Sequence, residues 1–340
     1  MMRCPPPHFA RCAIAALGFF CTTALAMSPP LLPTPIAATP SSTQMVAALN
    51  SVFGAHAHSR ANHAKGVLVQ ALFTPTASAA GISRAPHFSG APTPVLVRFS
   101  NFGGTPDIAD SDPRAAPYGM ALKFSLVDST ETDLVLHSYN GFPSATAADF
   151  VDFMTAMGQS PAHAPHPTKL ERYADVHPQA KAFLAAPKRA PASFSAQPYF
   201  SVNTFKFSNA AGVVHHGRYR LVPVGPAHYL DPARMISAAP DYLRTELVTR
   251  IEGGPVLMLL QLQLAERGDA LDDPSVAWPD TRSIVDLGVL SITSMIALVD
   301  PREQSVVFMP DDLPDGIESN DAMLKARTRA YAESLDRRLR

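Results

Sequence analysis

Short apolar segments, separated by glycine, proline and aspartate, follow one another along most of the chain after residue 66. These segments are rich in β-branched and aromatic residues, a composition that is typical of β-strands. We therefore expect eight or so strands, which the pattern places at 67–75, 94–102, 119–127, 132–139, 199–209, 216–224, 255–268 and 283–293.

Helical periodicity appears before, between and after these strands. Apolar residues recur every four positions in 44–56 and predict a helix there. Further helices are expected at 147–157 and 320–339, with helical pieces in the proline-broken region 161–198. Strands with helices between and after them predict an α+β fold, namely a closed antiparallel β-barrel with helical insertions and a C-terminal helix.

The N-terminal segment has the pattern of an export signal. Basic residues precede the apolar run 12–26, which ends in small residues and is too short to span a membrane. We expect a signal peptide at 1–26, a Pro-rich linker at 27–43 and a single domain at 44–340. The mature protein would be exported, with the periplasm as the expected location, and would have no membrane span. All three cysteines lie within 1–26, so the mature chain would contain no disulfide and no thiolate.

The charge of the chain is balanced. Its 28 lysines and arginines and 29 aspartates and glutamates give a formal net charge of −1. This balance gives no electrostatic footprint for nucleic acid or an anionic membrane, so we expect a small-molecule partner.

The expected strand 94–102 combines an apolar face with a partly polar one. Alternation places Val95, Val97 and Phe99 on one face, and Arg98 and Ser100 on the other. One interpretation is an edge strand whose polar face meets water. The other is a barrel interior that requires a cation and a hydroxyl group.

The C-terminal helix raises a similar question. Leu324, Arg327, Tyr331 and Leu335 follow one another at spacings of three and four and form one stripe. Arg327 could be solvated at the margin of this stripe. If Arg327 is buried, it needs an acceptor, and an ionised Tyr331 one turn away would provide one. An ionised phenol is also a hard ligand that suits ferric iron.

The chain has 12 histidines, of which three lie close together in "HAHSRANHAKG". His56, His58 and His63 do not share one face of a helix or strand, and no acidic residue accompanies them, so a zinc or copper site is not favoured. His63 alone is the candidate. His215 and His216 are expected in a turn.

Several motifs, taken together, resemble the haem catalases. "SRANHAKG", "PVLVRFSNFGG", "PYGMALKF", "TDLVLHSYNGFP", "YFSVNTFKF" and "LDDPSVAWPDTRSIVDLGVL" occur in the order found in that family. The end of the chain, "DGIESNDAMLKARTRAYAESL", looks like that of small exported catalase-related peroxidases. The resemblance covers roughly 44–338 and implies a catalase-like domain that binds haem b through its iron.

The resemblance also implies roles for individual residues. His63 matches the distal acid–base histidine, and Ser100 the hydroxyl that bonds its other ring nitrogen. Tyr331 matches the axial iron ligand, and Arg327 the arginine paired with it. The remaining matches are two arginines near the haem propionates and two aromatics at the distal haem face, which are Arg60, Arg98, Phe142 and Phe150.

One position departs from the family pattern. His137 stands where related enzymes have a distal asparagine. Histidine can donate one hydrogen bond as asparagine does, but it is bulkier and titrates near neutral pH. This change puts fast peroxide dismutation in doubt, and Asn140, three residues further on, is a conceivable substitute.

The function implied is a haem peroxidase, a monomer or small homo-oligomer. It would reduce hydrogen peroxide or organic peroxides with an unidentified organic electron donor, and weak catalase activity would accompany this reaction. The alternatives are an exported haem carrier or sensor, a barrel that binds an apolar ligand, a hydroperoxide-rearranging enzyme and a zinc hydrolase. A carrier would not need the pair His63–Ser100.

Overall fold

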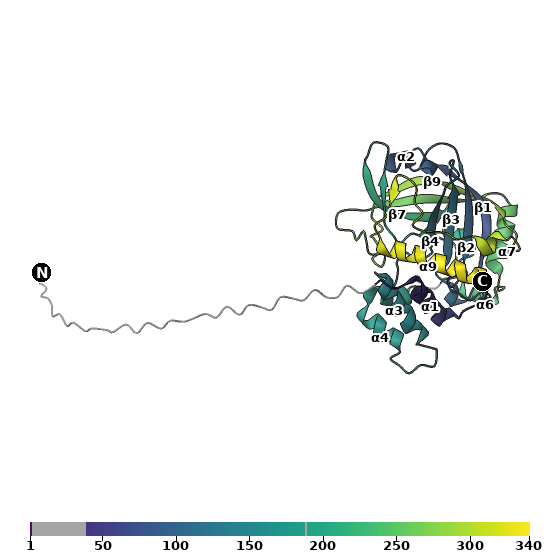
Figure 1. Ribbon diagram of the computed structural model, residues 1–340, viewed down its shortest axis with the longest axis vertical. Helices are drawn as coiled ribbons and strands as arrows, with labels where there is room; N and C mark the ends of the chain where they lie inside the picture. The colour runs from purple at the N-terminus through teal and green to yellow at the C-terminus, as the bar shows by residue number, and fades with distance from the viewer. Residues whose placement is uncertain (2–38, 188) are drawn as a thin grey trace. The chain divides into compact units, whose positions relative to one another are not determined.

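Antiparallel strands close into a barrel in the computed structural model of the chain, which describes residues 1, 39–187 and 189–340 (Figure 1). The described ring consists, in spatial order, of β7 (Val214–Pro223), β5 (Tyr199–Phe200), β4 (Glu131–His137), β3 (Gly119–Ser125), β2 (Thr93–Ser100), β1 (Gly66–Pro75), β9 (Ile284–Met295) and β8 (Val256–Leu264). β8 pairs again with β7 and closes the ring. β6 (Phe205–Ser208) pairs with β7, and β10 (Ile317–Glu318) pairs with β6.

The predicted closed antiparallel barrel is confirmed, with local differences. The expected strand 199–209 is split into β5 and β6 by residues 201–204. The expected turn at His215 and His216 is wrong, because both residues lie in β7 and pair with β6. The predicted signal peptide, 1–26, and most of the predicted linker lie outside the described residues apart from Met1.

Alternation along the strands separates the barrel interior from its outer wall. Val95, Val97 and Phe99 of β2 are at most 3% exposed and join the main apolar core. Arg98 and Ser100 lie on the opposite face and are also buried. Both expectations for this face are wrong. β2 lies between β1 and β3 and is not an edge strand, and this face points away from the barrel interior and is covered by helices.

Those helices come from both ends of the chain. α1 (Ser42–Phe53) begins two residues before the expected start, because Ser41 and Gln44 form a capping box. α3 (Ala147–Gly158) and α9 (Ala322–Leu339) fall where helices were expected. The other helices are α2 (Ala79–Ile82), α4 (Lys169–Val176), α5 (Pro178–Ala185), α6 (Pro232–Ser237), α7 (Tyr242–Glu252) and α8 (Arg302–Ser305), with 3₁₀ turns at Pro86–Phe88, Pro113–Ala115 and Phe194–Ala196.

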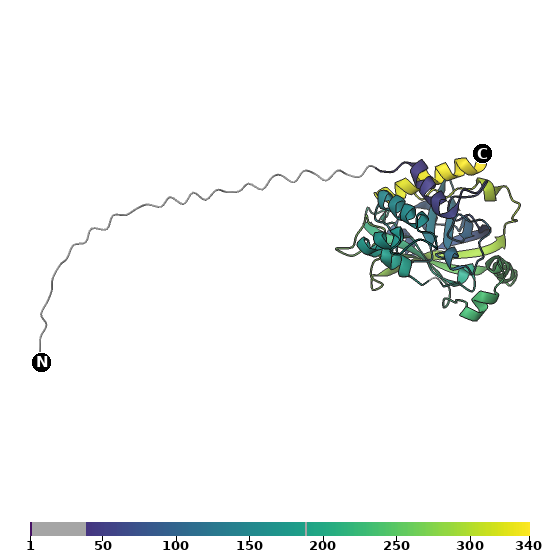
Figure 2. The same cartoon turned by 90° about the horizontal axis from the view of Figure 1, so that it is seen from below.

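α1, α3 and α9 pack into one layer. α9 crosses over one side of the barrel in Figure 1, and Figure 2 shows α1 running beside it. Their shared apolar cluster includes Met45 and Val46 of α1, Ala147 of α3, and Met323 and Ala330 of α9. The layer and the outer barrel wall thus enclose a space between them.

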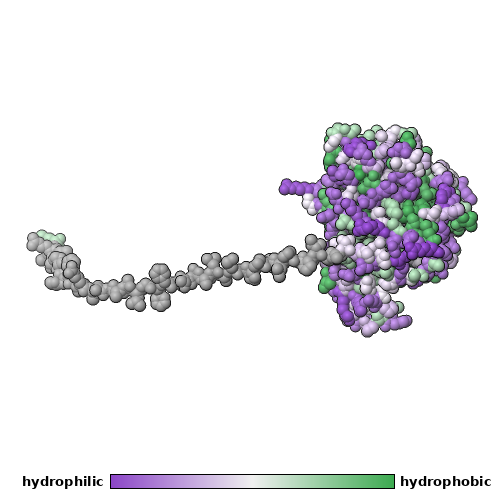
Figure 3. Space-filling model, viewed as in Figure 1, coloured by the Kyte–Doolittle hydropathy of each residue, from purple (hydrophilic) through white to green (hydrophobic). Residues whose placement is uncertain are grey.

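The outer surface of the helical part is polar. Hydrophilic residues cover most of the region around α4 in Figure 3, while Ala174 of this helix is buried. Among the described residues, no helix has both the length and the apolar character needed to cross a membrane.

Candidate active site

A hollow of about 160 Å³ lies between the outer wall of the barrel and the helical layer, and it is partly open to the solvent. β2, β3 and β4 supply one wall, while α1, α3 and α9 supply the other. All nine residues predicted for the site line this cavity: Arg60, His63, Arg98, Ser100, His137, Phe142, Phe150, Arg327 and Tyr331.

Strand register places two polar residues and a glycine in one row. Ser100 on β2 pairs with Gly119 on β3, which in turn pairs with His137 on β4. Directly opposite residues of an antiparallel sheet point to the same face. His63 lies over the middle of this row, because a Cβ added to Gly119 would come within 2.6 Å of both His63 Nδ1 and Ser100 Oγ. The row therefore requires glycine at position 119.

The hydrogen bonds of His63 define its tautomer. Its Nδ1 lies 3.0 Å from the carbonyl oxygen of Asn101 and 3.0 Å from Ser100 Oγ. A carbonyl oxygen can only accept, so Nδ1 carries the hydrogen and Nε2 of the neutral ring keeps a lone pair. Burial, and secondarily the positive charge of Arg98, lowers the pKa of His63 to about 3. The ring is thus a neutral imidazole with a proton-accepting nitrogen at neutral pH.

The backbone at His63 is held in an unusual conformation. Its φ of 55° lies in the left-handed region, which residues other than glycine rarely adopt. The His63 N–H donates to Phe102 O, and Arg98 donates to the carbonyl oxygens of His63 and Ala64 at 2.9 and 3.1 Å. These bonds hold a conformation that costs free energy, a pattern that is common at functional sites.

His137 is the second imidazole of the cavity. Both of its ring nitrogens are buried, and neither has a hydrogen-bond partner among the described residues. Burial, with smaller effects of Arg327 and His63, lowers its pKa to about 3. Asn140 does not line the cavity. The expectation that Asn140 could take the place of the distal asparagine is therefore wrong. Unpaired buried nitrogens are costly, so we expect a water molecule or a ligand in the cavity to bond to them.

On the helical side of the cavity, Tyr331 is hydrogen-bonded to an arginine. Its phenol oxygen accepts hydrogen bonds from Nε and a terminal nitrogen of Arg327, at 3.3 and 2.9 Å. The other terminal nitrogen of Arg327 donates to Asn203 Oδ1 at 2.6 Å, and Asn203 donates to the buried Asp321 at 2.7 Å. Arg327 is therefore paired within the cavity wall and not solvated. Charge-assisted hydrogen bonds of this kind fix the position of the phenol oxygen.

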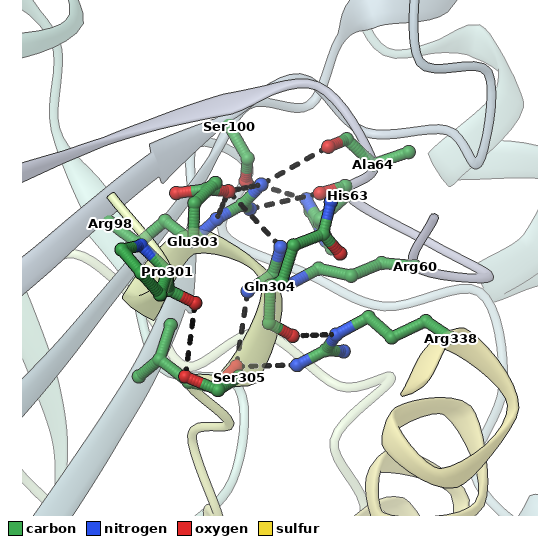
Figure 4. A network of polar contacts seen from close by, with 11 residues as sticks. Arg60, His63, Ala64, Arg98, Ser100, Pro301, Glu303, Gln304, Ser305 and Arg338 are labelled. Atoms are coloured by element: carbon green, nitrogen blue, oxygen red, sulfur yellow. Dashed lines mark hydrogen bonds and ion pairs between the residues drawn. The ribbon is translucent and has the colours of Figure 1, made fainter. Parts of the chain in front are cut away.

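A cluster of arginines forms one end of the cavity (Figure 4). Arg60, Arg98 and Arg338 approach a single carboxylate, Glu303 of α8. Arg98 lies 2.8 Å and Arg60 3.1 Å from its Oε1. Arg338 instead donates to the carbonyl oxygens of Gln304 and Val306, at 2.6 and 2.5 Å.

Phe142 and Phe150 form an aromatic surface in the cavity. Their rings stack with centroids 5.7 Å apart and an interplanar angle of 16°. Phe142 also lies against the ring of His137, with centroids 6.3 Å apart. The pair provides an apolar contact surface for a planar ligand.

Several polar residues of the site were not predicted from the sequence. Arg338 lies seven residues after Tyr331 on α9, so an extended helical stripe would have found it. Asn203 lies at the break between β5 and β6, where a continuous strand was expected. Glu303 and Asn62, whose Oδ1 is buried without a partner, gave no signal in the sequence. The neighbouring histidines contact backbone carbonyl oxygens: His56 lies 2.9 Å from Phe53 O, and His58 lies 3.3 Å from Arg338 O.

The residues of the cavity fit the group that the sequence implied. A phenol oxygen with two guanidinium donors suits an iron ligand, and an arginine cluster with one carboxylate leaves positive charge for the acid groups of a porphyrin. The unpaired nitrogens of His137 are consistent with a further ligand on the barrel side.

Comparisons with known proteins find matches over most of the chain. The family model described as Catalase matches residues 43–340. A protein of Mycolicibacterium paratuberculosis named catalase-related peroxidase is 35% identical over 86% of this chain and 93% of its own length. A second protein of that name, from Synechococcus elongatus, is 32% identical over 87% of this chain and 88% of its own length.

Solved structures extend the likeness to the fold. A fungal catalase superposes with a TM-score of 0.73 at 21% identity, over 83% of this chain. Catalase A from Saccharomyces cerevisiae gives 0.72, also at 21% identity and over 83% of this chain. The chain spans 60% and 61% of these two longer proteins.

Proposed function

This chain belongs to the catalase family, and we propose that it is a haem-dependent peroxidase that reduces hydrogen peroxide or organic peroxides with an organic electron donor. The names of its relatives support a peroxide-acting oxidoreductase, since two proteins more than 30% identical to it are called catalase-related peroxidase. The observation that carries the proposal is the pairing of an oriented imidazole, His63, with an arginine-bound phenol, Tyr331, in one cavity.

Tyr331 is the residue that would hold the haem iron. Tyr331 lines the cavity, and its phenol oxygen, an atom type that binds ferric iron, accepts from Arg327 at 2.9 Å. When bound, haem supplies the redox chemistry that the side chains of this cavity lack. Arg327 donates hydrogen bonds to the phenol oxygen of Tyr331. Asn203, which itself donates to Asp321, accepts from Arg327 and holds it in place.

His63 is the proposed acid–base residue. Its Nε2 accepts the hydroperoxyl proton of the substrate and returns it to the departing oxygen, which leaves as water or as an alcohol. Ser100 and the Asn101 carbonyl keep the proton on Nδ1, so that Nε2 is the accepting atom. The donor supplies the two electrons and two protons that complete the reduction to water and alcohol, or to two waters when the substrate is hydrogen peroxide.

His137 supports peroxidase turnover over dismutation. Its buried ring replaces the smaller amide of related enzymes and has one donor and one acceptor nitrogen facing the site. We expect this change to disfavour the second peroxide molecule that dismutation needs, leaving weak catalase activity.

We further propose that the protein is exported to the periplasm after removal of residues 1–26, and that it acts as a monomer or small homo-oligomer. The support is the pattern of basic, apolar and small residues at the N-terminus. Peptide sequencing of the mature N-terminus in a periplasmic extract tests export directly.

The test of the proposed function is the variant His63→Ala in haem-loaded protein. Peroxide reduction with an organic donor should fall by about 10²–10⁴-fold, because the positioned proton acceptor is lost, while haem content stays the same. Ser100→Ala should give a smaller loss, since the Asn101 carbonyl remains. His163→Ala, at an exposed position, is the matched control.

Unchanged turnover in His63→Ala would remove this residue from the mechanism. Haem binding without any peroxide turnover in the native protein would favour a carrier. Conversion of a fatty hydroperoxide without consumption of a donor would favour a rearranging enzyme.

A further inference from the structure

The arginine cluster at the end of the cavity is only partly neutralised. Arg60, Arg98 and Arg338 carry three positive charges, and Glu303 is the one carboxylate that pairs with them among the described residues. Arg98 is 3% and Arg338 4% exposed. The cluster therefore holds two buried positive charges in excess.

The pKa values of two of these arginines reflect this excess of positive charge. Burial and the charges of Arg98 and Arg338 lower the pKa of Arg60 to about 8, against the opposing effect of Glu303. Burial, followed by the charge of Arg98, lowers the pKa of Arg338 to about 10. Buried cations of this kind are costly unless an anion joins them.

The excess matches one property of the proposed cofactor. A b-type porphyrin carries two carboxylates, and two positive charges remain after Glu303 is counted. Glu303 contacts Arg60 and Arg98 at 3.1 and 2.8 Å and belongs to the short helix α8, beside the backbone that accepts from Arg338 (Figure 4). It is thus placed to set the charge of the whole cluster.

We propose that Glu303 sets how strongly the cluster binds the acid groups of the cofactor: it cancels one of three arginine charges and so limits the preference of the cluster for a porphyrin with free carboxylates. This inference rests on the proposed haem site. It differs from the arginine contacts themselves, because it assigns the selectivity to the net charge that Glu303 leaves.

The experiment compares two fluorescent ligands, metal-free protoporphyrin IX and its dimethyl ester, on the purified full-length mature chain. The ester has the same ring and no acid groups, so the ratio of the two dissociation constants reports the charge of the cluster. Glu303→Gln should raise the preference for the diacid by about tenfold or more, because the excess charge rises from two to three. It should also lower the melting temperature of the ligand-free protein.

A charge series separates this effect from simple damage. Arg60→Gln lowers the excess charge to one and should reduce the preference about tenfold. The double variant Arg60→Gln/Glu303→Gln restores an excess of two and should return the preference to that of the native protein, even if Glu303→Gln alone does not fold. Glu333→Gln, which removes the carboxylate of a helical ion pair with Arg337, is the matched control and should leave the ratio unchanged.

The inference is overturned if the double variant does not recover the native preference, or if a folded Glu303→Gln shows an equal or weaker one. Failure of the native protein to bind either porphyrin is a different result, which would overturn the proposed function instead.

Discussion

At the scale of single residues, His63 and His137 show two ways of placing an imidazole in one cavity. His63 has its Nδ1 bound by Ser100 and Asn101, so its tautomer is set. His137 has no partner for either nitrogen among the described residues, so the protein itself does not set its tautomer. We therefore expect His63 to transfer protons, and we expect the size and hydrogen bonding of His137 to limit which molecule binds beside it.

The residue His137 gives a direct prediction. His137→Asn should increase oxygen release from hydrogen peroxide relative to donor oxidation, because the amide leaves more room for a second peroxide and still donates a hydrogen bond. A rise of about tenfold corresponds to ~1.4 kcal/mol, the size of one hydrogen bond. An oxygen electrode and a donor assay on the same preparation measure the ratio. No rise, with His163→Asn as control, would mean that His137 does not limit dismutation.

His87 gives a second prediction, away from the site. It is buried among Phe73, Phe88 and Phe124, and burial lowers its pKa to about 3. The unfolded chain binds a proton here near pH 6.5, whereas the folded chain does not, so stability is lost as the pH falls from about 6.5 towards 3. Between pH 7.5 and pH 5 the loss from this one residue should be ~2 kcal/mol.

The variant His87→Phe tests this loss. Urea unfolding should show that its free energy of unfolding falls less on acidification than that of the native protein, by about the same ~2 kcal/mol. An identical pH dependence in both proteins would show that His87 is protonated in the folded state.

At the scale of secondary-structure elements, three neighbouring strands and one helix position the site. The register of β2, β3 and β4 aligns Ser100, Gly119 and His137 on the outer wall. α9 presents Tyr331 and its partner Arg327 from the opposite side. Because the three paired strands and the helix α9 are continuous, their backbone hydrogen bonds hold the two sides of the cavity rigidly.

Gly119 is the element-scale prediction. In Gly119→Ala, the new Cβ would lie 2.6 Å from His63 Nδ1 and from Ser100 Oγ, so the imidazole must shift. Peroxide reduction should fall by at least about tenfold, since a small misplacement of a catalytic group is costly, while the strand pairing is retained. Gly81→Ala is the control, because no atom lies within 4 Å of the added Cβ. Equal activity of the two variants would contradict the proposed position of His63.

At the scale of the whole molecule, the strand pattern predicted the barrel but not which face holds the site. Alternation correctly separated Val95, Val97 and Phe99 from Arg98 and Ser100. It could not reveal that helices from distant parts of the chain cover the outer wall, since that depends on tertiary packing. The pattern therefore left two expectations for the polar face of β2, an edge strand in water or the barrel interior. This face instead lies on the outer wall beneath the helices.

The same limit explains which site residues the sequence revealed. Most of the predicted residues lie in motifs of the family or on a helical stripe, and the structure brings them into one cavity. Glu303 lies in the short helix α8, and nothing local marks it as a partner of Arg60 and Arg98. Such contacts arise only when segments separated by about 200 residues in sequence fold together.

The most direct test of the account is the visible spectrum of the mature protein loaded with haem, compared between the native chain and Tyr331→Phe. The native protein should show a strong Soret band, and the variant should show an altered spectrum and weaker haem retention, because the axial phenol oxygen is missing. Tyr242→Phe, whose hydroxyl bonds Pro191 O away from the cavity, should match the native spectrum. A native protein that stays colourless with ample haem, or a Tyr331→Phe spectrum identical to the native one, would contradict the account.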